Sequence, residues 1–180
     1  AELTVEASGP NCTRRFFLKI PNMLKRTHTC GELSKKDIDQ EAILCGWVDS
    51  RRDHGGLVFI DLRDRYGVTQ VVFNPQHGEE LHRKARDLRV EYVVAVKGKV
   101  SPRPPGTINP KLPTGEIELY ATDLEILNKA DPLPFELEER AGVSQELRFR
   151  YRYLDMRRPQ VKDYFLFRHR LCQLIRQYLD

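Results

Sequence analysis

Apolar and polar residues alternate through much of the first 130 residues, a pattern typical of β-strands with one buried face. The clearest alternation is in residues 57–63, where Val58, Ile60 and Leu62 occupy one face and Phe59, Asp61 and Arg63 the other. Turn signals bound this segment, at 54–56 and 64–67. Similar patterns predict a strand from about residue 41 through Trp47 and Val48, and further strands at 57–63, 68–73, 90–100 and 116–127.

Between the third and fourth predicted strands the apolar spacing becomes helical. Leu81, Ala85 and Leu88 recur at the spacing of one helix face within 78–89. Five prolines and one glycine in 101–113 predict a loop. Three strands, a helix and two strands follow one another in an OB-fold, whose second and third strands and neighbouring loops bind oligonucleotides. The sequence therefore predicts an all-β OB-fold barrel of five strands with one helix.

The outward face of the second predicted strand carries the candidate chemistry. Phe59 lies there among charged residues, near Arg51 and Arg52, which lead into the turn. An aromatic ring can stack an unpaired base while guanidinium groups hold phosphates. In the alternative interpretation Phe59 is a second-layer core residue and Arg63 pairs with Asp61. Alternation alone does not separate the two.

Composition and charge narrow the class of protein only slightly. The chain has 180 residues, 40% of them hydrophobic and 31% charged, which fits one soluble domain plus part of another. No apolar run approaches the ~20 residues that span a bilayer, and a net charge of +4 permits a polyanionic partner without requiring one. The four cysteines are widely spaced, so we expect no metal site, no disulfide framework and a reducing, cytoplasmic location.

The two ends of the chain differ from the predicted barrel. Residues 1–25 have no clear period, and we expect a disordered extension there. Residues 130–147 contain two prolines and no steady period, which predicts a hinge. Five arginines then interleave with aromatic residues within 148–158. Residues 163–180 predict an amphipathic helix, whose apolar stripe has no partner within the chain and consists of Phe167, Leu171, Leu174 and Tyr178.

Several segments closely resemble the anticodon-binding domain of bacterial-type aspartyl-tRNA synthetases, which are class II enzymes. The shared motifs occur in the family's order: GWV, RRDHGG, FIDLRDR and QVVF within 44–73, TGEIE at 114–118 and RYRYLDMRRP at 150–159. The resemblance implies an anticodon-binding domain at 26–129 and a hinge at 130–147. It also implies that 148–180 begin a truncated α+β catalytic domain.

The same resemblance implies roles for five residues. Phe59 would stack on an anticodon base, Arg52 and Gln70 would contact anticodon bases or their backbone, and Glu118 would accept hydrogen bonds from a base edge. His54 resembles the residue of relatives that charge both tRNA-Asp and tRNA-Asn, where stricter relatives often carry leucine. A non-discriminating enzyme is the resulting hypothesis, and the alternative is that His54 is only a turn residue.

The complete enzyme of this family attaches aspartate to tRNA-Asp with ATP and Mg²⁺ and is a homodimer. Its catalytic motifs 2 and 3 do not occur in these 180 residues. We therefore expect no catalytic residue, no bound cofactor and no aminoacylation by this chain alone. Two alternatives are an asparaginyl or lysyl relative and a free-standing OB-fold that binds single strands. The unpartnered last helix and the 148–159 tract argue against the free-standing protein.

Overall fold

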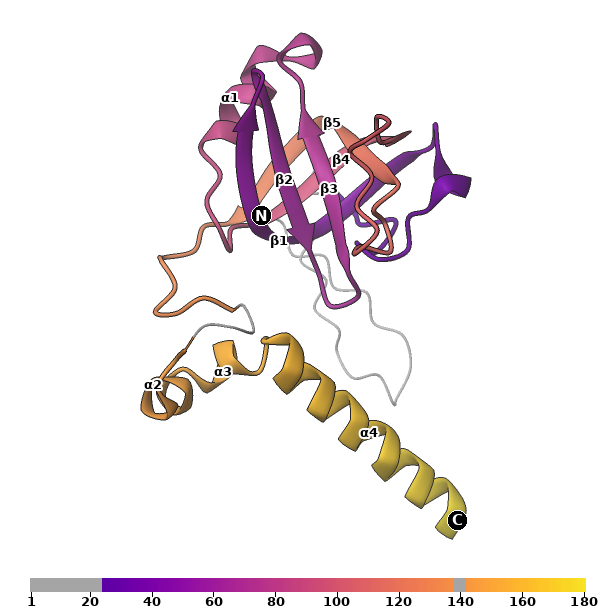
Figure 1. The fold of residues 1–180 in the computed structure, drawn as a ribbon, viewed down its shortest axis with the longest axis vertical. Coiled ribbons are helices and arrows are strands. Elements are labelled where there is room, and N and C mark those ends of the chain that lie inside the picture. The colour runs from indigo at the N-terminus through magenta and orange to yellow at the C-terminus, as the bar shows by residue number, and fades with distance from the viewer. Residues whose placement is uncertain (1–23, 138–141) are drawn as a thin grey trace, which may run out of the picture. The chain divides into compact units, whose positions relative to one another are not determined.

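The protein's structure is a computed structural model that describes residues 24–137 and 142–180. The chain divides into two compact units between Asp131 and Pro132, and each unit is described by itself (Figure 1). The predicted N-terminal extension, 1–25, lies outside the described residues except for Leu24 and Lys25.

The first unit is the predicted OB-fold. Its strands are β1 (Glu41–His54), β2 (Leu57–Arg63), β3 (Val68–Phe73), β4 (Val93–Pro102) and β5 (Ile117–Asn128). They form a closed barrel in the order β1-β2-β3-β5-β4, and β4 pairs back onto β1. The β3–β5 pair is parallel and the other pairs are antiparallel. Two short 3₁₀ turns, Lys35–Asp37 and Pro75–His77, precede β1 and follow β3.

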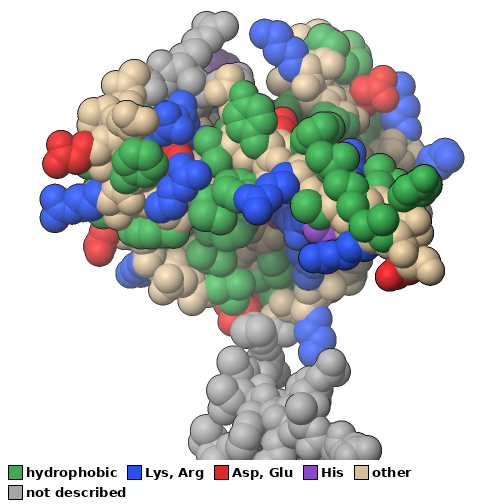
Figure 2. Space-filling view, turned by 90° about the horizontal axis from the view of Figure 1, so that it is seen from below, with side chains coloured by type: hydrophobic (Ala, Val, Ile, Leu, Met, Phe, Trp, Pro, Cys, Tyr) green, Lys and Arg blue, Asp and Glu red, His purple; other side chains and the backbone are tan. Residues whose placement is uncertain are grey.

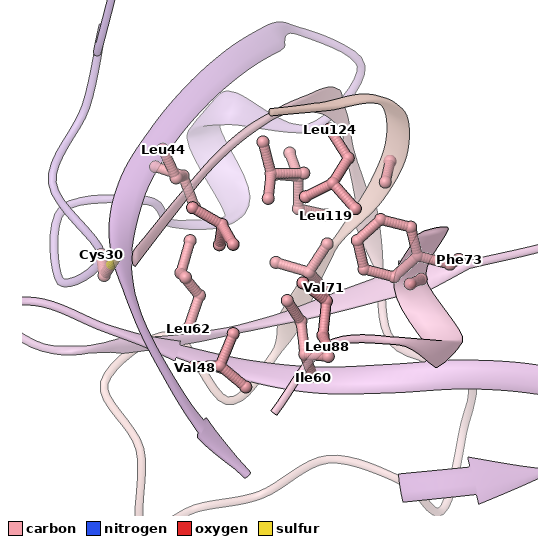
Figure 3. Packing of buried hydrophobic residues seen from close by; sticks show 14 of the residues in the cluster. Cys30, Leu44, Val48, Ile60, Leu62, Val71, Phe73, Leu88, Leu119 and Leu124 are labelled. Carbon is pink, nitrogen blue, oxygen red and sulfur yellow. The ribbon is translucent and has the colours of Figure 1, made fainter. Parts of the chain in front are cut away.

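The interior of the barrel is apolar, whereas the surface drawn in Figure 2 shows Lys and Arg side chains among hydrophobic ones. Inside, residues such as Leu44, Ile60 and Leu119 pack together (Figure 3). Helix α1 (Glu79–Arg86) contributes Ala85 to this cluster, and Leu88 follows it there, with exposed fractions of 0% and 2%. The helical apolar stripe predicted from sequence is therefore confirmed.

Two predicted strand limits are wrong. Arg51 and Arg52 do not lead into a turn but belong to β1, which pairs with β2 as far as His54. A two-residue Gly55–Gly56 turn, with φ of 60° and 79°, lets both strands pair up to the tip. At the other end, β4 begins at Val93 instead of residue 90, because Glu91 has a φ of 67° and turns the chain before the strand starts.

The second unit consists of helices α2 (Gln145–Arg150), α3 (Arg152–Asp155) and α4 (Pro159–Leu179). Helix α2 starts inside the segment predicted as a hinge, and the Ser144 hydroxyl caps it by accepting from the Leu147 N–H. Asp155 is inaccessible to solvent and bonds to Arg148 at 2.8 Å and Arg152 at 2.6 Å. Part of the basic tract is thus an internal ion network. Among the described residues, no helix is long and apolar enough to cross a membrane.

Candidate nucleic-acid interface

The outer face of the barrel aligns four side chains in one row across β1, β2, β3 and β5. Arg52 lies opposite Phe59, and Phe59 lies opposite Val72. Val72 in turn pairs with Tyr120. Because directly opposed residues of a sheet share a face, the row is continuous. The row runs from Arg52 through Phe59 and Val72 to Tyr120, so that the apolar side chain of Val72 lies between two aromatic rings.

Phe59 presents part of its ring to solvent. It is half-buried on the outer face and does not belong to the interior cluster. The alternative pairing of Arg63 with Asp61 is wrong, since Arg63 bonds to Asp49 at 2.6 Å and also to Glu91. The Phe59 ring is therefore partly accessible for stacking.

Arg52, beside that ring, is held by an acid of the neighbouring strand. Its Nη2 donates to both oxygens of Asp61, at 2.9 and 2.8 Å, and the Ser50 hydroxyl donates to the same carboxylate at 2.6 Å. The Arg52 side chain is still 57% exposed. A phosphate or a base oxygen approaching Phe59 would meet an oriented guanidinium. Arg51 lies on the opposite side of the sheet, where its Nη1 donates to the carbonyl of Arg86, so the two arginines do not act together.

Gln70 and Glu118 form a hydrogen-bonded pair in the next row. Gln70 Nε2 donates to Glu118 Oε2 at 3.1 Å, and the two residues are only 8% and 3% exposed. Burial raises the pKa of Glu118, and hydrogen bonds from Tyr120 and Gln70 together with the charge of Arg103 oppose that rise. The pair lies on the predicted face but is far less accessible than strand alternation suggests.

The proline-rich loop between β4 and β5 adds Arg103, which sequence reasoning missed. The loop folds back on β3, where the Thr114 hydroxyl donates to the Val68 carbonyl. Arg103 is 8% exposed and donates from Nε to the Ile117 carbonyl at 3.1 Å and from Nη1 to the Thr107 carbonyl at 3.3 Å.

The remaining nitrogen of this guanidinium, Nη2 of Arg103, is buried and has no hydrogen-bond partner in the described part of the chain. An unpaired buried donor costs about 1–3 kcal/mol, so a ligand oxygen placed there would gain a strong contact. Its position in the sequence could have identified Arg103 as a candidate binding residue. It lies between two prolines in a loop with which OB-folds bind oligonucleotides.

His54 ends β1 at the tip of the hairpin, exposed and opposite Leu57. It is two residues from Arg52 and therefore on the same side of the strand. The structure thus brings Arg52, Phe59, Gln70 and Glu118 into adjacent rows of one face, with His54 at its edge. Within the described residues, no three His, Cys, Asp or Glu side chains are grouped to hold a metal ion.

Comparison with known proteins agrees with the OB-fold assignment. Residues 42–127 match the tRNA anticodon family described as "OB-fold nucleic acid binding domain". The chain is 52% identical over 157 residues to an aspartate–tRNA(Asp/Asn) ligase from Caldanaerobacter subterraneus subsp. tengcongensis, covering 87% of this chain and 26% of that protein. It is 55% identical over 155 residues to the ligase of the same name from Thermodesulfovibrio yellowstonii, covering 86% and 26%.

A solved structure is also similar in fold. Asparaginyl-tRNA synthetase from Pyrococcus horikoshii, complexed with asparaginyl-adenylate, superposes with a TM-score of 0.73 at 27% identity, over 87% of this chain and 34% of that one. The chain spans about a quarter of the length of the curated relatives it matches.

Proposed function

Residues 42–127 belong to the tRNA anticodon-binding family of OB-fold nucleic acid binding domains, and on this premise we propose that the outer face of the barrel binds the anticodon loop of a tRNA. The observation that carries the proposal is the half-buried ring of Phe59 beside the oriented guanidinium of Arg52, one row from a hydrogen-bonded amide–carboxylate pair. Stacking, charge and edge readout are the means by which proteins recognise single-stranded RNA.

Each side chain has a distinct part in this proposal. Phe59 stacks on one anticodon base, and Arg52 exchanges its bond with Asp61 for a phosphate or a base oxygen. Gln70 and Glu118 read the edge of a neighbouring base. Glu118 is almost fully buried, so we propose that the proline-rich loop shifts when a base edge binds. That shift would also present the unpaired Nη2 of Arg103 to the incoming base.

We further propose that the chain is the N-terminal part of an aspartate–tRNA ligase. The 52% and 55% identity to proteins of that name supports this assignment. The substrate RNA is then tRNA-Asp, and the (Asp/Asn) in the relatives' names supports tRNA-Asn as a second substrate. In the complete ligase, ATP and Mg²⁺ drive the attachment of aspartate, and residues outside these 180 supply that chemistry. A second copy of the chain completes a homodimer.

The direct test is binding of the chain to the anticodon stem-loop of tRNA-Asp, measured by fluorescence anisotropy at a fixed salt concentration. Stacking on an aromatic ring contributes ~1–3 kcal/mol, so Phe59→Ala should weaken binding by ~5- to 150-fold. Phe165→Ala is the control, because Phe165 is 39% exposed but belongs to α4 in the other unit.

A second RNA with a swapped anticodon separates recognition from backbone affinity, which is independent of sequence. We expect the wild-type chain to prefer the tRNA-Asp anticodon and the Phe59→Ala chain to lose most of that preference. Equal binding of both RNAs by the wild type would favour a free-standing binder of single strands. Phe59→Ala affinity within twofold of the wild type would contradict the proposed site.

A further inference from the structure

A concave surface lies on the other side of β1 from Arg52. It is a cavity of about 730 Å³ where the end of α1 and the segment after it meet β1 and the residue following β5. Four cations line it: Arg51, Arg86, Arg89 and Lys129. None of these residues belongs to the row that contains Phe59.

Three of the four cavity cations differ from the cations of the strands in their pairing. Every lysine and arginine within the five strands has a carboxylate partner: Arg51, Arg52, Arg63, Lys97 and Lys99. By contrast, Arg86, Arg89 and Lys129 are exposed and have no ion pair within the described residues. Asp87 is the single acid of the lining. Clustered like charges in a concave site raise the local potential and attract a counter-ion.

The rest of the cavity is suited to a sugar–phosphate chain. Leu88 and Tyr92, with exposed fractions of 2% and 9%, contribute apolar surface to the lining. Arg51 is fixed in place, since Nη1 donates to the Arg86 carbonyl and Nη2 bonds to Asp53 at 3.2 Å. The bond to Arg86 also satisfies a carbonyl at the end of α1, whose negative dipole would otherwise repel an anion. Three arginines provide planar forks that match phosphate oxygens.

We propose that this cavity binds phosphate groups, and that the backbone of the bound RNA, outside the anticodon loop, supplies them. The second part of this inference rests on the proposed function. Neighbouring residues of a strand point to opposite faces, so Arg51 and Arg52 stand on either side of the β1–β2 hairpin. An RNA whose loop is held at Arg52 can therefore place a phosphate of its adjoining stem against Arg51 and the unpaired cations beyond it.

The test uses the 180-residue chain and two triple variants that each remove two arginines and one lysine. Arg86→Gln/Arg89→Gln/Lys129→Gln removes the three cavity cations that have no ion pair within the described residues. Arg65→Gln/Arg83→Gln/Lys36→Gln removes the same charge from exposed positions outside the cavity. Affinity is measured across a salt series for the anticodon stem-loop and for its loop alone as a single strand.

We expect the cavity variant to bind the stem-loop more weakly. A plot of the logarithm of its affinity against the logarithm of the salt concentration should also be less steep, by roughly 1 for each removed side chain that contacts a phosphate. The loss of affinity should be the same for stem-loops with the cognate and with the swapped anticodon. The single-stranded loop should bind the cavity variant and the control variant with equal affinity. If the two triple variants change stem-loop binding equally, the cavity is only part of a diffuse positive field and the inference is wrong.

If the wild-type chain does not bind the stem-loop, the proposed function has failed. A third experiment then tests the cavity by itself. Tripolyphosphate is then titrated and followed by NMR. Binding that is lost only in the cavity variant would support the phosphate site with a free polyphosphate as its ligand, and binding that both variants retain would overturn it. Equal affinity for an oligoglutamate would overturn the phosphate assignment in favour of an acidic protein segment.

Discussion

At the scale of single residues, the site depends on a carboxylate that is buried. Glu118 is 3% exposed, and burial raises its pKa above the ordinary 4.5. It remains useful as a hydrogen-bond acceptor because Tyr120 and Gln70 donate to it and Arg103 lies nearby. Burying a charge is costly unless such partners are present. The same partners therefore oppose the rise in pKa and hold the carboxylate oxygens in place for a base.

This environment predicts a pH dependence of stability with a definite sign. A raised folded-state pKa means that the folded chain binds the Glu118 proton more tightly than the unfolded chain, so this residue's contribution to stability declines as pH rises above 4.5 through the raised value. Glu118→Gln cannot ionise and should become more stable relative to wild type over that pH range. Urea unfolding from pH 4 to 8, followed by the fluorescence of the single tryptophan, Trp47, measures the difference.

The exposed acid Asp123 provides the control for this experiment. It lies on the same strand, β5, in a solvent-exposed position, and Asp123→Asn should leave the pH profile near that of the wild type. A Glu118→Gln difference that is constant from pH 4 to 8 would contradict the raised pKa.

His54 is the residue at which specificity for the RNA can be examined. It is exposed at the hairpin tip on the same face as Arg52, where an imidazole can donate or accept a hydrogen bond and a leucine cannot. We expect His54→Leu to weaken binding to the tRNA-Asn anticodon stem-loop more than to the tRNA-Asp one. His169→Leu, an exposed histidine of α4, is the control. Equal losses for both RNAs would leave His54 as only a turn residue.

At the scale of elements, the second unit shows how a basic tract is held together. Asp155 has no exposed surface, bonds to Arg148 and Arg152, and lies 3.6 Å from Arg158. These contacts, with the Arg148 hydrogen bond the strongest, lower the pKa of Asp155 below its ordinary 3.8. The stabilisation is therefore present above pH 3.8 and is lost as pH falls through the lowered value.

Removing this carboxylate should loosen α2 and α3 without affecting the barrel. Asp155→Asn leaves the arginines without their anion, and because Arg148 and Arg152 are 34% and 45% exposed water compensates part of the loss, so we expect about 1–3 kcal/mol. Amide hydrogen exchange should report faster exchange in α2 and α3 alone. Asp163→Asn, an exposed acid of α4, is the matched control. Unchanged protection in the Asp155→Asn chain would refute the role given to this network.

At the scale of the whole molecule, α4 carries a large apolar surface. In the described part of this 21-residue helix the single buried residue is Val161. The predicted stripe is exposed, with fractions of 69% for Phe167, 46% for Leu171, 64% for Leu174 and 89% for Tyr178. Contiguous apolar surface of this kind marks an interaction site in soluble proteins. The proposed homodimer assigns a second copy of the chain to it.

Self-association through this stripe can be tested by analytical ultracentrifugation. We expect the wild-type chain to associate as its concentration rises and Leu171→Glu/Leu174→Glu to remain monomeric, because two charges in an apolar interface lack partners. Gln173→Glu/Gln177→Glu changes the charge of the same helix equally, outside the stripe, and should associate as the wild type does. A wild-type chain that stays monomeric would remove the basis for dimerisation through α4.

The sequence by itself determined the order of strands and helix, the apolar face of each, and which side of β2 carries Phe59, because alternation and helical spacing follow directly from local backbone geometry. Only the tertiary structure decided that β1 continues through Arg52, since strand length depends on a partner and a turn. It also decided that Glu118 is buried, that Arg103 comes to lie beside it, and that Arg86, Arg89 and Lys129 share one cavity. These properties arise from contacts between residues far apart in the chain, which no local pattern records.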